Sequence, residues 1–298
     1  MLEAPLFRQT ANRGCGIIIS RTAPQAQVTG RVTRALDMES STETKERFGR
    51  LMTRRDFLAL AGATGTLSCL SPFSPVSADD NDGVLQARPG RPSTSITPGV
   101  HKLGLSTDRD GLLYIPRGHN VNTSAPLAVM LHGADRNGQA MEYTFSLADD
   151  FGVVIVAPDS RGRTWDAILG EFGADVAYID AALRYTFARC AVDPTRLAIA
   201  GFSDGASYAL SLGTTNGDLF SHVIAFSPGF IAPAELRGKP RIFISHGKED
   251  AVLPIDTTSR KIIRQLIQAG YNLKYREFIG PHTVPLRIAH EAFEWFMR

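Results

Sequence analysis

The sequence predicts an α/β fold in which a mostly parallel sheet is covered by helices on both faces. Short apolar runs alternate with helical segments along the chain, and this alternation is typical of parallel sheets. Some runs, such as 127–131, are apolar at every position, as expected of strands that are buried on both faces. Another apolar run leads through a Gly-x-Ser-x-Gly turn at 201–205 into small, helix-compatible residues. This local order of strand, sharp turn and helix fits the same kind of sheet.

The individual elements follow from the spacing of apolar residues. Apolar runs predict strands at 101–105, 111–115, 127–131, 153–157, 197–200, 223–226 and 241–245, and rough alternation of apolar and polar residues predicts another at 273–279. The turn signal Asp108-Arg109-Asp110-Gly111 joins the first two runs into a hairpin. Helical spacing predicts helices at 139–151, 175–189, 262–268 and 288–297.

Composition and charge exclude several classes of protein. The chain of 298 residues is 43% hydrophobic and 21% charged, values that are ordinary for a soluble globular protein. Its formal charge of +2 arises before Ala78, where 10 Lys and Arg face 6 Asp and Glu, so the remainder is slightly acidic. No basic patch with interleaved aromatic residues occurs, and nucleic acid is therefore not an expected partner. No His, Asp or Glu spacing resembles a metal cage, and no metal or other cofactor is expected.

The stretch 52–78 has the features of a twin-arginine signal peptide. Arg54-Arg55 precedes an apolar stretch that runs to Leu70, and Val76-Ser77-Ala78 supplies a small-x-small end. The apolar stretch, about fourteen residues, is too short to span a bilayer comfortably, so no stable membrane anchor is expected. Cys69 could be mistaken for a lipid-attachment site, but the aliphatic residue usual three positions before it is missing. The mature protein is expected to be exported, to the periplasm or the extracellular space.

The chain therefore divides into four expected regions. Residues 1–51 show little apolar periodicity, precede Met52, and are expected to be disordered or an upstream extension that is not made in the cell. Residues 79–98, rich in Pro, Ser, Arg and Asp, predict a flexible linker. The folded domain is expected over 99–298. Its one cysteine, Cys190, leaves no internal disulfide.

Three strand ends carry residues suited to nucleophilic catalysis. Ser203 lies at the centre of the Gly-x-Ser-x-Gly turn, His246 to Asp250 follow the run at 241–245, and His282 follows the run at 273–279. A serine hydroxyl needs a base to accept its proton and a third group to orient that base. Ser203 as nucleophile, His282 as base and Asp250 as acid satisfy this need in the chain order that such sheets use. A chance match of the pentapeptide in a glycine-rich turn is the alternative.

Other residues near these strand ends compete for the same roles. Glu249 adjoins Asp250 as an alternative acid, and His246 is an alternative base, although a structural role suits its place beside Gly247 better. The backbone N–H groups of Asp204 and Ala134 are expected to stabilise an oxyanion, because one follows the nucleophile and the other lies in the loop after an earlier strand.

Two further side chains are candidates for lining the substrate site. His132 is expected to shape the oxyanion loop, or to be a simple histidine at a strand end. Trp165 lies in the long segment 158–172 and could cover an acyl group or pack within its loop.

Over about residues 99–298 the sequence resembles the α/β hydrolases, and within them the small phospholipase/carboxylesterase type. The resemblance rests on Leu131-His132-Gly133, on the run 201–207, on His246-Gly247 with Asp250 and Pro254, and on Gly280-Pro281-His282. The family's HG-x-x-D-x-x-x-P run corresponds to Asp250 rather than Glu249. Ala134 stands where typical members have glycine, and Ala206 where many have a second glycine, so substrate preference does not carry over.

The resemblance implies an α/β-hydrolase fold and a serine hydrolase that cleaves carboxylic esters through an acyl-enzyme without a cofactor. Its partner would be a small-molecule or lipid-like ester. Short gaps between the matched elements leave no room for a large lid. A serine peptidase of the same fold is the first alternative, and a catalytically inactive binding module is the second.

Overall fold

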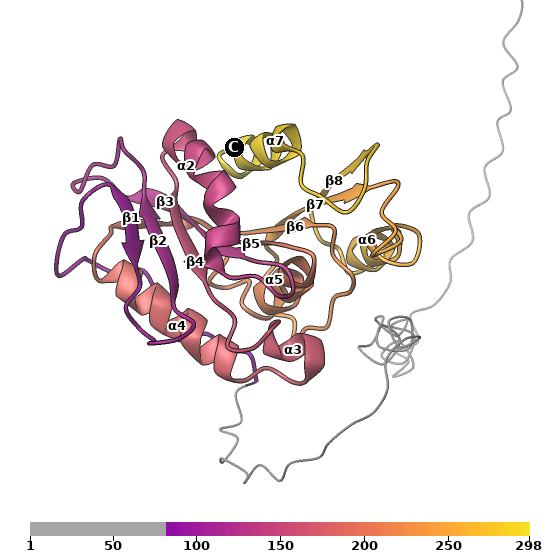
Figure 1. Cartoon of the computed structure of the whole chain (residues 1–298), viewed down its shortest axis with the longest axis horizontal. Coiled ribbons are helices and arrows are strands. Elements are labelled where there is room, and N and C mark those ends of the chain that lie inside the picture. The colour runs from indigo at the N-terminus through magenta and orange to yellow at the C-terminus, as the bar shows by residue number, and fades with distance from the viewer. Residues whose placement is uncertain (1–81) are drawn as a thin grey trace, which may run out of the picture. The chain divides into compact units, whose positions relative to one another are not determined.

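The computed structural model describes residues 82–298, which contain one sheet of eight strands in the order β1-β2-β4-β3-β5-β6-β7-β8 (Figure 1). Strand β1 pairs antiparallel with β2, and β2 pairs antiparallel with β4, whereas all other neighbours are parallel. The strands span Gly99–Lys102 (β1), Gly111–Ile115 (β2), Ala125–Leu131 (β3), Val154–Pro158 (β4), Val192–Phe202 (β5), His222–Phe226 (β6), Arg241–Gly247 (β7) and Leu273–Phe278 (β8). The mostly parallel sheet predicted from the sequence is confirmed.

Helices cover both faces of this sheet. They are Phe145–Phe151 (α2), Asp166–Leu169 (α3), Ala174–Phe187 (α4), Asp204–Thr215 (α5), Ser259–Gln268 (α6) and Leu286–Phe296 (α7). Helices α2 and α7 contact each other on one face, while α4 and α5 lie on the other (Figure 1). Strand β3 shows the division, because Leu127 and Val129 join the apolar cluster under α4 and α5 whereas Ala128 and Met130 join the cluster under α2 and α7. Burial on both faces explains why this strand is apolar at every position.

The parallel strands bring distant parts of the sequence to one edge of the sheet. In the register of the sheet Gly201 of β5 pairs with Leu131 of β3, and Gly247 of β7 pairs with Phe278 of β8. The loops that follow β3, β5, β7 and β8 therefore leave the sheet at the same edge, where open α/β sheets carry their functional groups.

One predicted helix is divided in the structure. Residues 139–151 were expected to form a single helix, but they form a 3₁₀ helix, Gly138–Thr144 (η2), followed by α2. The Thr144 hydroxyl donates to the carbonyl of Met141, three residues earlier, at 2.7 Å. Such a local side-chain bond competes with regular α-helical pairing at the junction.

The segment predicted as a flexible linker is packed against the domain in its described part. Leu85 is fully buried, and its N–H donates to Oδ1 of Asn216 at 2.8 Å. One oxygen of Asp180 accepts the N–H groups of Gln86 and Ala87 at 2.7 and 2.6 Å. The packed chain thus begins before Gly99, because one apolar side chain and three backbone donors find partners on the domain. The regions predicted as an extension and as a signal peptide, and the first residues of the predicted linker, lie outside the described residues.

Candidate active site

The centre of the candidate site is the turn between β5 and α5. Ser203 has φ 59° and ψ −120°, a backbone conformation that L-residues seldom adopt and that is found at functional turns. A Cβ on Gly201 would lie 2.2 Å from the carbonyl oxygen of Gly205, and one on Gly205 would lie 2.3 Å from that of Leu131. Both glycines are therefore required for strand and helix to approach each other around Ser203, as the motif predicts.

Ser203, His282 and Asp250 lie in one hydrogen-bonded chain, although they are far apart in the sequence. His282 Nε2 is 2.9 Å from Ser203 Oγ, and His282 Nδ1 is 2.6 Å from Asp250 Oδ2. A carboxylate only accepts hydrogen bonds, so Nδ1 carries the proton and Nε2 is left to accept from the serine hydroxyl. The imidazole is held in the tautomer that a general base requires.

Asp250 is fixed by its own loop. The N–H groups of Val252 and Leu253 donate to Asp250 Oδ1 at 2.9 and 2.8 Å, and the carboxylate is fully buried. Glu249, the alternative acid, is exposed, and its backbone N–H donates to Gly280 at 3.0 Å. The structure brings Asp250 and not Glu249 to His282.

His246, the alternative base, lies behind the acid rather than beside the serine. Its ring is fully buried, with Nδ1 2.6 Å from Ser259 Oγ and Nε2 2.8 Å from the carbonyl oxygen of Leu253. Nε2 also lies 3.1 Å from Asp250 Oδ2. Burial lowers the pKa of His246, which favours the neutral ring.

Two backbone amides lie close to Ser203. Asp204 is the first residue of α5, so its N–H has no acceptor within the helix and points out of a helix N-terminus. A Cβ on Gly133 would lie 3.4 Å from Cβ of Ser203, so the loop after β3 passes directly over the nucleophile. Ala134 follows in that loop, and it lines a cleft whose wall also includes Ser203. The arrangement suits the stabilisation of an oxyanion by the amides of Ala134 and Asp204.

His132 and Trp165, predicted as substrate-lining residues, are both fully buried and lie outside that cleft. His132 Nε2 accepts the N–H of Ser160 at 3.0 Å, while Nδ1 donates to the carbonyl of Gly133 at 2.8 Å. Trp165 Nε1 donates to the carbonyl of His132 at 2.9 Å. Their polar atoms are therefore used to hold the loop that carries Ala134. Neither side chain lines the cleft. Their contacts match the other role that the sequence left open for each residue, because His132 shapes the oxyanion loop and Trp165 is packed against His132 and Tyr208.

Comparison with known proteins identifies the family of the chain. A family model described as "Putative esterase" matches residues 104–261, which is more than half of the chain. The chain belongs to this esterase family. The match covers β2 to β7 and includes Ser203 and Asp250.

Several curated proteins that resemble this chain come from fungi. The esterase is 30% identical to a protein named "Probable feruloyl esterase C" from Aspergillus oryzae, over 171 residues that make up 54% of this chain and 61% of the relative. It is 28% identical to "Feruloyl esterase C" of Emericella nidulans, over 64% of this chain and 70% of the relative. The match to the Aspergillus oryzae protein thus spans less than two thirds of its length.

Solved structures share the fold. Esterase PE8 superposes with a TM-score of 0.52 at 24% identity, over 62% of this chain and 96% of its own. The CE1 ferulic acid esterase AmCE1/Fae1A of Anaeromyces mucronatus, solved with ferulic acid, gives a TM-score of 0.52 at 19% identity, over 71% of this chain and 95% of its own. At these identities the likeness concerns the α/β-hydrolase fold, which the esterase shares.

A cleft of about 420 Å³ opens beside Ser203 and His282 in the esterase. Its walls come from the loop after β3, from η2, and from the loops that carry the acid and the base. Most of the side chains around the two polar residues are apolar or aromatic: Ala134, Ala140, Met141, Tyr143, Phe202, Val252 and Val284. Phe202 also packs against the His282 ring, with centroids 4.7 Å apart. Apart from Ala134, none of these residues could be predicted as cleft residues from the sequence, because apolar side chains give no signal that separates a cleft from a core.

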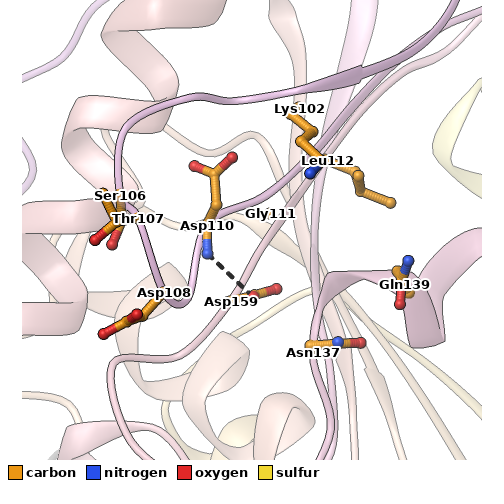
Figure 2. Close-up of a pocket in the computed structure, with 10 residues that line it drawn as sticks. All are labelled: Lys102, Ser106, Thr107, Asp108, Asp110, Gly111, Leu112, Asn137, Gln139 and Asp159. Carbon is orange, nitrogen blue, oxygen red and sulfur yellow. Dashed lines mark hydrogen bonds between the residues drawn. The ribbon is translucent and has the colours of Figure 1, made fainter.

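A second, polar hollow of about 240 Å³ contains none of the residues of the catalytic chain (Figure 2). Asp110 and Asp159 line it, but their carboxylates are already engaged. Asp110 accepts the N–H groups of Gly104 and Leu105 at 2.8 and 2.9 Å, and Asp159 accepts those of Gly138 and Asp110 at 2.7 and 3.1 Å. These carboxylates hold loops together. In residues 82–298 no cluster of three or more potential ligands could hold a metal ion.

Proposed function

We propose that this esterase hydrolyses carboxylic esters through a covalent acyl-enzyme formed on Ser203. The observation that carries the proposal is the continuous chain from Ser203 Oγ through the His282 ring to Asp250, at 2.9 and 2.6 Å, at the wall of an apolar cleft. Membership of an esterase family supports the same chemistry.

In the proposed reaction His282 Nε2 takes the proton from Ser203 as the hydroxyl oxygen attacks the ester carbonyl carbon. The amides of Ala134 and Asp204 stabilise the negative oxygen of the tetrahedral intermediate, with about 3 to 4 kcal/mol at stake for each donor. His282 then returns the proton to the leaving alcohol, which departs as the C–O bond breaks. Water repeats the sequence on the acyl-enzyme and releases the acid. Asp250 keeps the imidazole oriented and stabilises its charged form.

We infer that the cleft accepts a flat, largely apolar acyl group such as a hydroxycinnamoyl group. Tyr143 and Phe202 offer aromatic surface within the same cleft as Ser203. Aromatic rings favour offset or edge-to-face contacts with other rings. The relatives whose names include feruloyl esterase support this class of substrate.

A substrate panel tests the proposal. Purified residues 82–298 are assayed with methyl ferulate, with methyl acetate as the short-chain control, and with a feruloyl amide of the same acyl group. Hydrolysis of methyl ferulate, with kcat/KM well above that for the acetate, is expected. A preference for the amide would instead support a peptidase, and the absence of any turnover together with no labelling by a fluorophosphonate would support an inactive binding module.

We also propose that residues 52–78 direct twin-arginine export and that the mature protein starts at Asp79. Arg54-Arg55, the apolar stretch and the Val76-Ser77-Ala78 end support this. The described residues contain no helix with the length and apolar character needed to cross a bilayer. In a host with this export pathway, the Arg54→Lys/Arg55→Lys variant should remain in the cytoplasm. Undiminished export of the variant would contradict the proposal.

A further inference from the structure

Two histidine rings converge on one oxygen of the buried Asp250. Asp250 Oδ2 is 2.6 Å from Nδ1 of His282 and 3.1 Å from Nε2 of His246. We propose that His246 is a positioning residue whose Nε2–H fixes the Asp250 carboxylate against which His282 is oriented. The inference rests on the proposed function. It assigns to His246 the task of holding the acid in place, whereas His282 acts as the base and Asp250 as the acid.

The neighbours of the His246 ring determine where its proton lies. Nε2 faces two oxygens that can only accept, the carbonyl oxygen of Leu253 at 2.8 Å and Asp250 Oδ2, so Nε2 must carry hydrogen. Nδ1 is 2.6 Å from the hydroxyl of Ser259, which can donate. In a neutral ring Nδ1 accepts from Ser259, and the single Nε2 hydrogen is shared between the Leu253 carbonyl oxygen and, at the longer distance, Asp250 Oδ2. Burial, which lowers the pKa of His246, favours that neutral form.

The carboxylate needs this donor because it is buried without a cationic side chain. Among the residues that the structure describes, Asp250 has no Lys or Arg partner. Two backbone N–H groups occupy Oδ1, and the two histidines occupy Oδ2. A buried charge that loses one of its few donors is poorly compensated, and its orientation is less restricted.

Ser259 connects this arrangement to α6. It is the first residue of that helix, and its side chain is fully buried against His246. The titratable groups that face the His246 ring are Asp250, from the loop after β7, and His282, from the loop after β8. The orientation of the acid is thus tied to one helix and two strands rather than to its own loop alone.

Removing the donor should change both the rate and its pH dependence. In a His246→Leu variant, Asp250 Oδ2 retains more negative charge and favours the imidazolium form of the base. The acid limb of the kcat profile should therefore move to higher pH, and kcat should fall about 10-fold while KM for methyl ferulate changes less than about 2-fold. His246→Gln, whose amide N–H can reach the position of Nε2, should restore most of kcat and the original limb.

His222 supplies a matched control. It is a buried strand histidine whose ring nitrogens lie near Ser221 and Arg241, with no contact to Asp250 or His282. His222→Leu should leave the pH profile and kcat unchanged, even if it lowers the melting temperature. Equal effects of His246→Leu and His222→Leu on kcat and on the limb would show that His246 is merely structural and would overturn the proposal.

A measurement on the unaltered enzyme covers the case in which His246→Leu fails to fold. Two-bond ¹H–¹⁵N spectra of histidine-labelled protein, with His246→Gln used for assignment, should show His246 as a neutral ring protonated on Nε2 at pH 7. A ring protonated on Nδ1 would overturn the proposal. If the wild-type protein neither hydrolyses methyl ferulate nor reacts with a fluorophosphonate, the proposed function itself has failed, and the spectrum still reports whether His246 Nε2 carries the hydrogen that the proposal requires.

Discussion

Replacing Asp250 by asparagine should disable the base without removing it. Asp250 Oδ1 accepts from the N–H groups of Val252 and Leu253, whereas Oδ2 faces His282 Nδ1 at 2.6 Å and His246 Nε2 at 3.1 Å. An asparagine NH₂ cannot face the two backbone donors, so it must face His282. Nδ1 of His282 then has to accept, and the ring proton moves to Nε2, where it blocks transfer from Ser203.

The size of the effect follows from this enforced tautomer. By analogy with the equivalent change in serine proteases, kcat should fall about 10⁴-fold, or roughly 5 kcal/mol of transition-state stabilisation. Steady-state hydrolysis of methyl ferulate measures it, with the melting temperature as a check on folding. Glu249→Gln is the matched control, because Glu249 is an exposed neighbouring carboxylate, and it should retain wild-type activity. If Glu249→Gln were the more damaging change, or if Asp250→Asn lost less than about 10-fold, the assignment of the acid would be refuted.

Three further predictions concern stability. Burial lowers the pKa of His222 to about 4, so as the pH falls the unfolded chain binds the extra proton before the folded protein does. Between pH 6.5 and 4 the free energy of unfolding of the wild type should therefore fall by roughly 3 kcal/mol more than that of His222→Leu. Urea unfolding at a series of pH values measures both, and an equal pH dependence of the two proteins would refute this. Gly205→Ala should destabilise the fold by about 1 to 3 kcal/mol or more, because its Cβ would lie 2.3 Å from a backbone oxygen. Gly118→Ala is the control and should be neutral, because a Cβ there would meet no atom within 4 Å. Equal melting temperatures for the two variants would contradict the steric argument. Leu85→Ala should cost about 2 to 5 kcal/mol by denaturant unfolding, and a cost near zero would show that the segment before Gly99 does not pack.

The sheet could be predicted because its strands are read from continuous apolar runs and its turn from glycines. Strand β3 is buried on both faces, so its sequence has no polar position to confuse the prediction. The contact of Ser203, Asp250 and His282 also followed, because parallel strands end at one edge and the three residues follow strands of that sheet.

The direction in which loop side chains point could not be predicted from the sequence. For Trp165 and His132 the sequence left open whether they line the substrate site or pack and shape the loop, and their donors and acceptors hold the loop after β3. Leu85 lies in a stretch rich in Pro and Arg, and a single apolar residue gives no periodicity to detect. The residues that bind the backbone of Leu85 and Gln86, Asn216 at the end of α5 and Asp180 on α4, lie about a hundred residues further along the chain.

The most direct test of the account is the identity of the residue that forms the covalent intermediate. Residues 82–298 are incubated with a fluorophosphonate, digested, and mapped by mass spectrometry, beside Ser203→Ala as control. The account predicts one stoichiometric adduct on the peptide that contains Ser203, loss of methyl ferulate hydrolysis in proportion to labelling, and no adduct on a folded Ser203→Ala protein. Stoichiometric labelling of another serine, or full activity in Ser203→Ala, would contradict it.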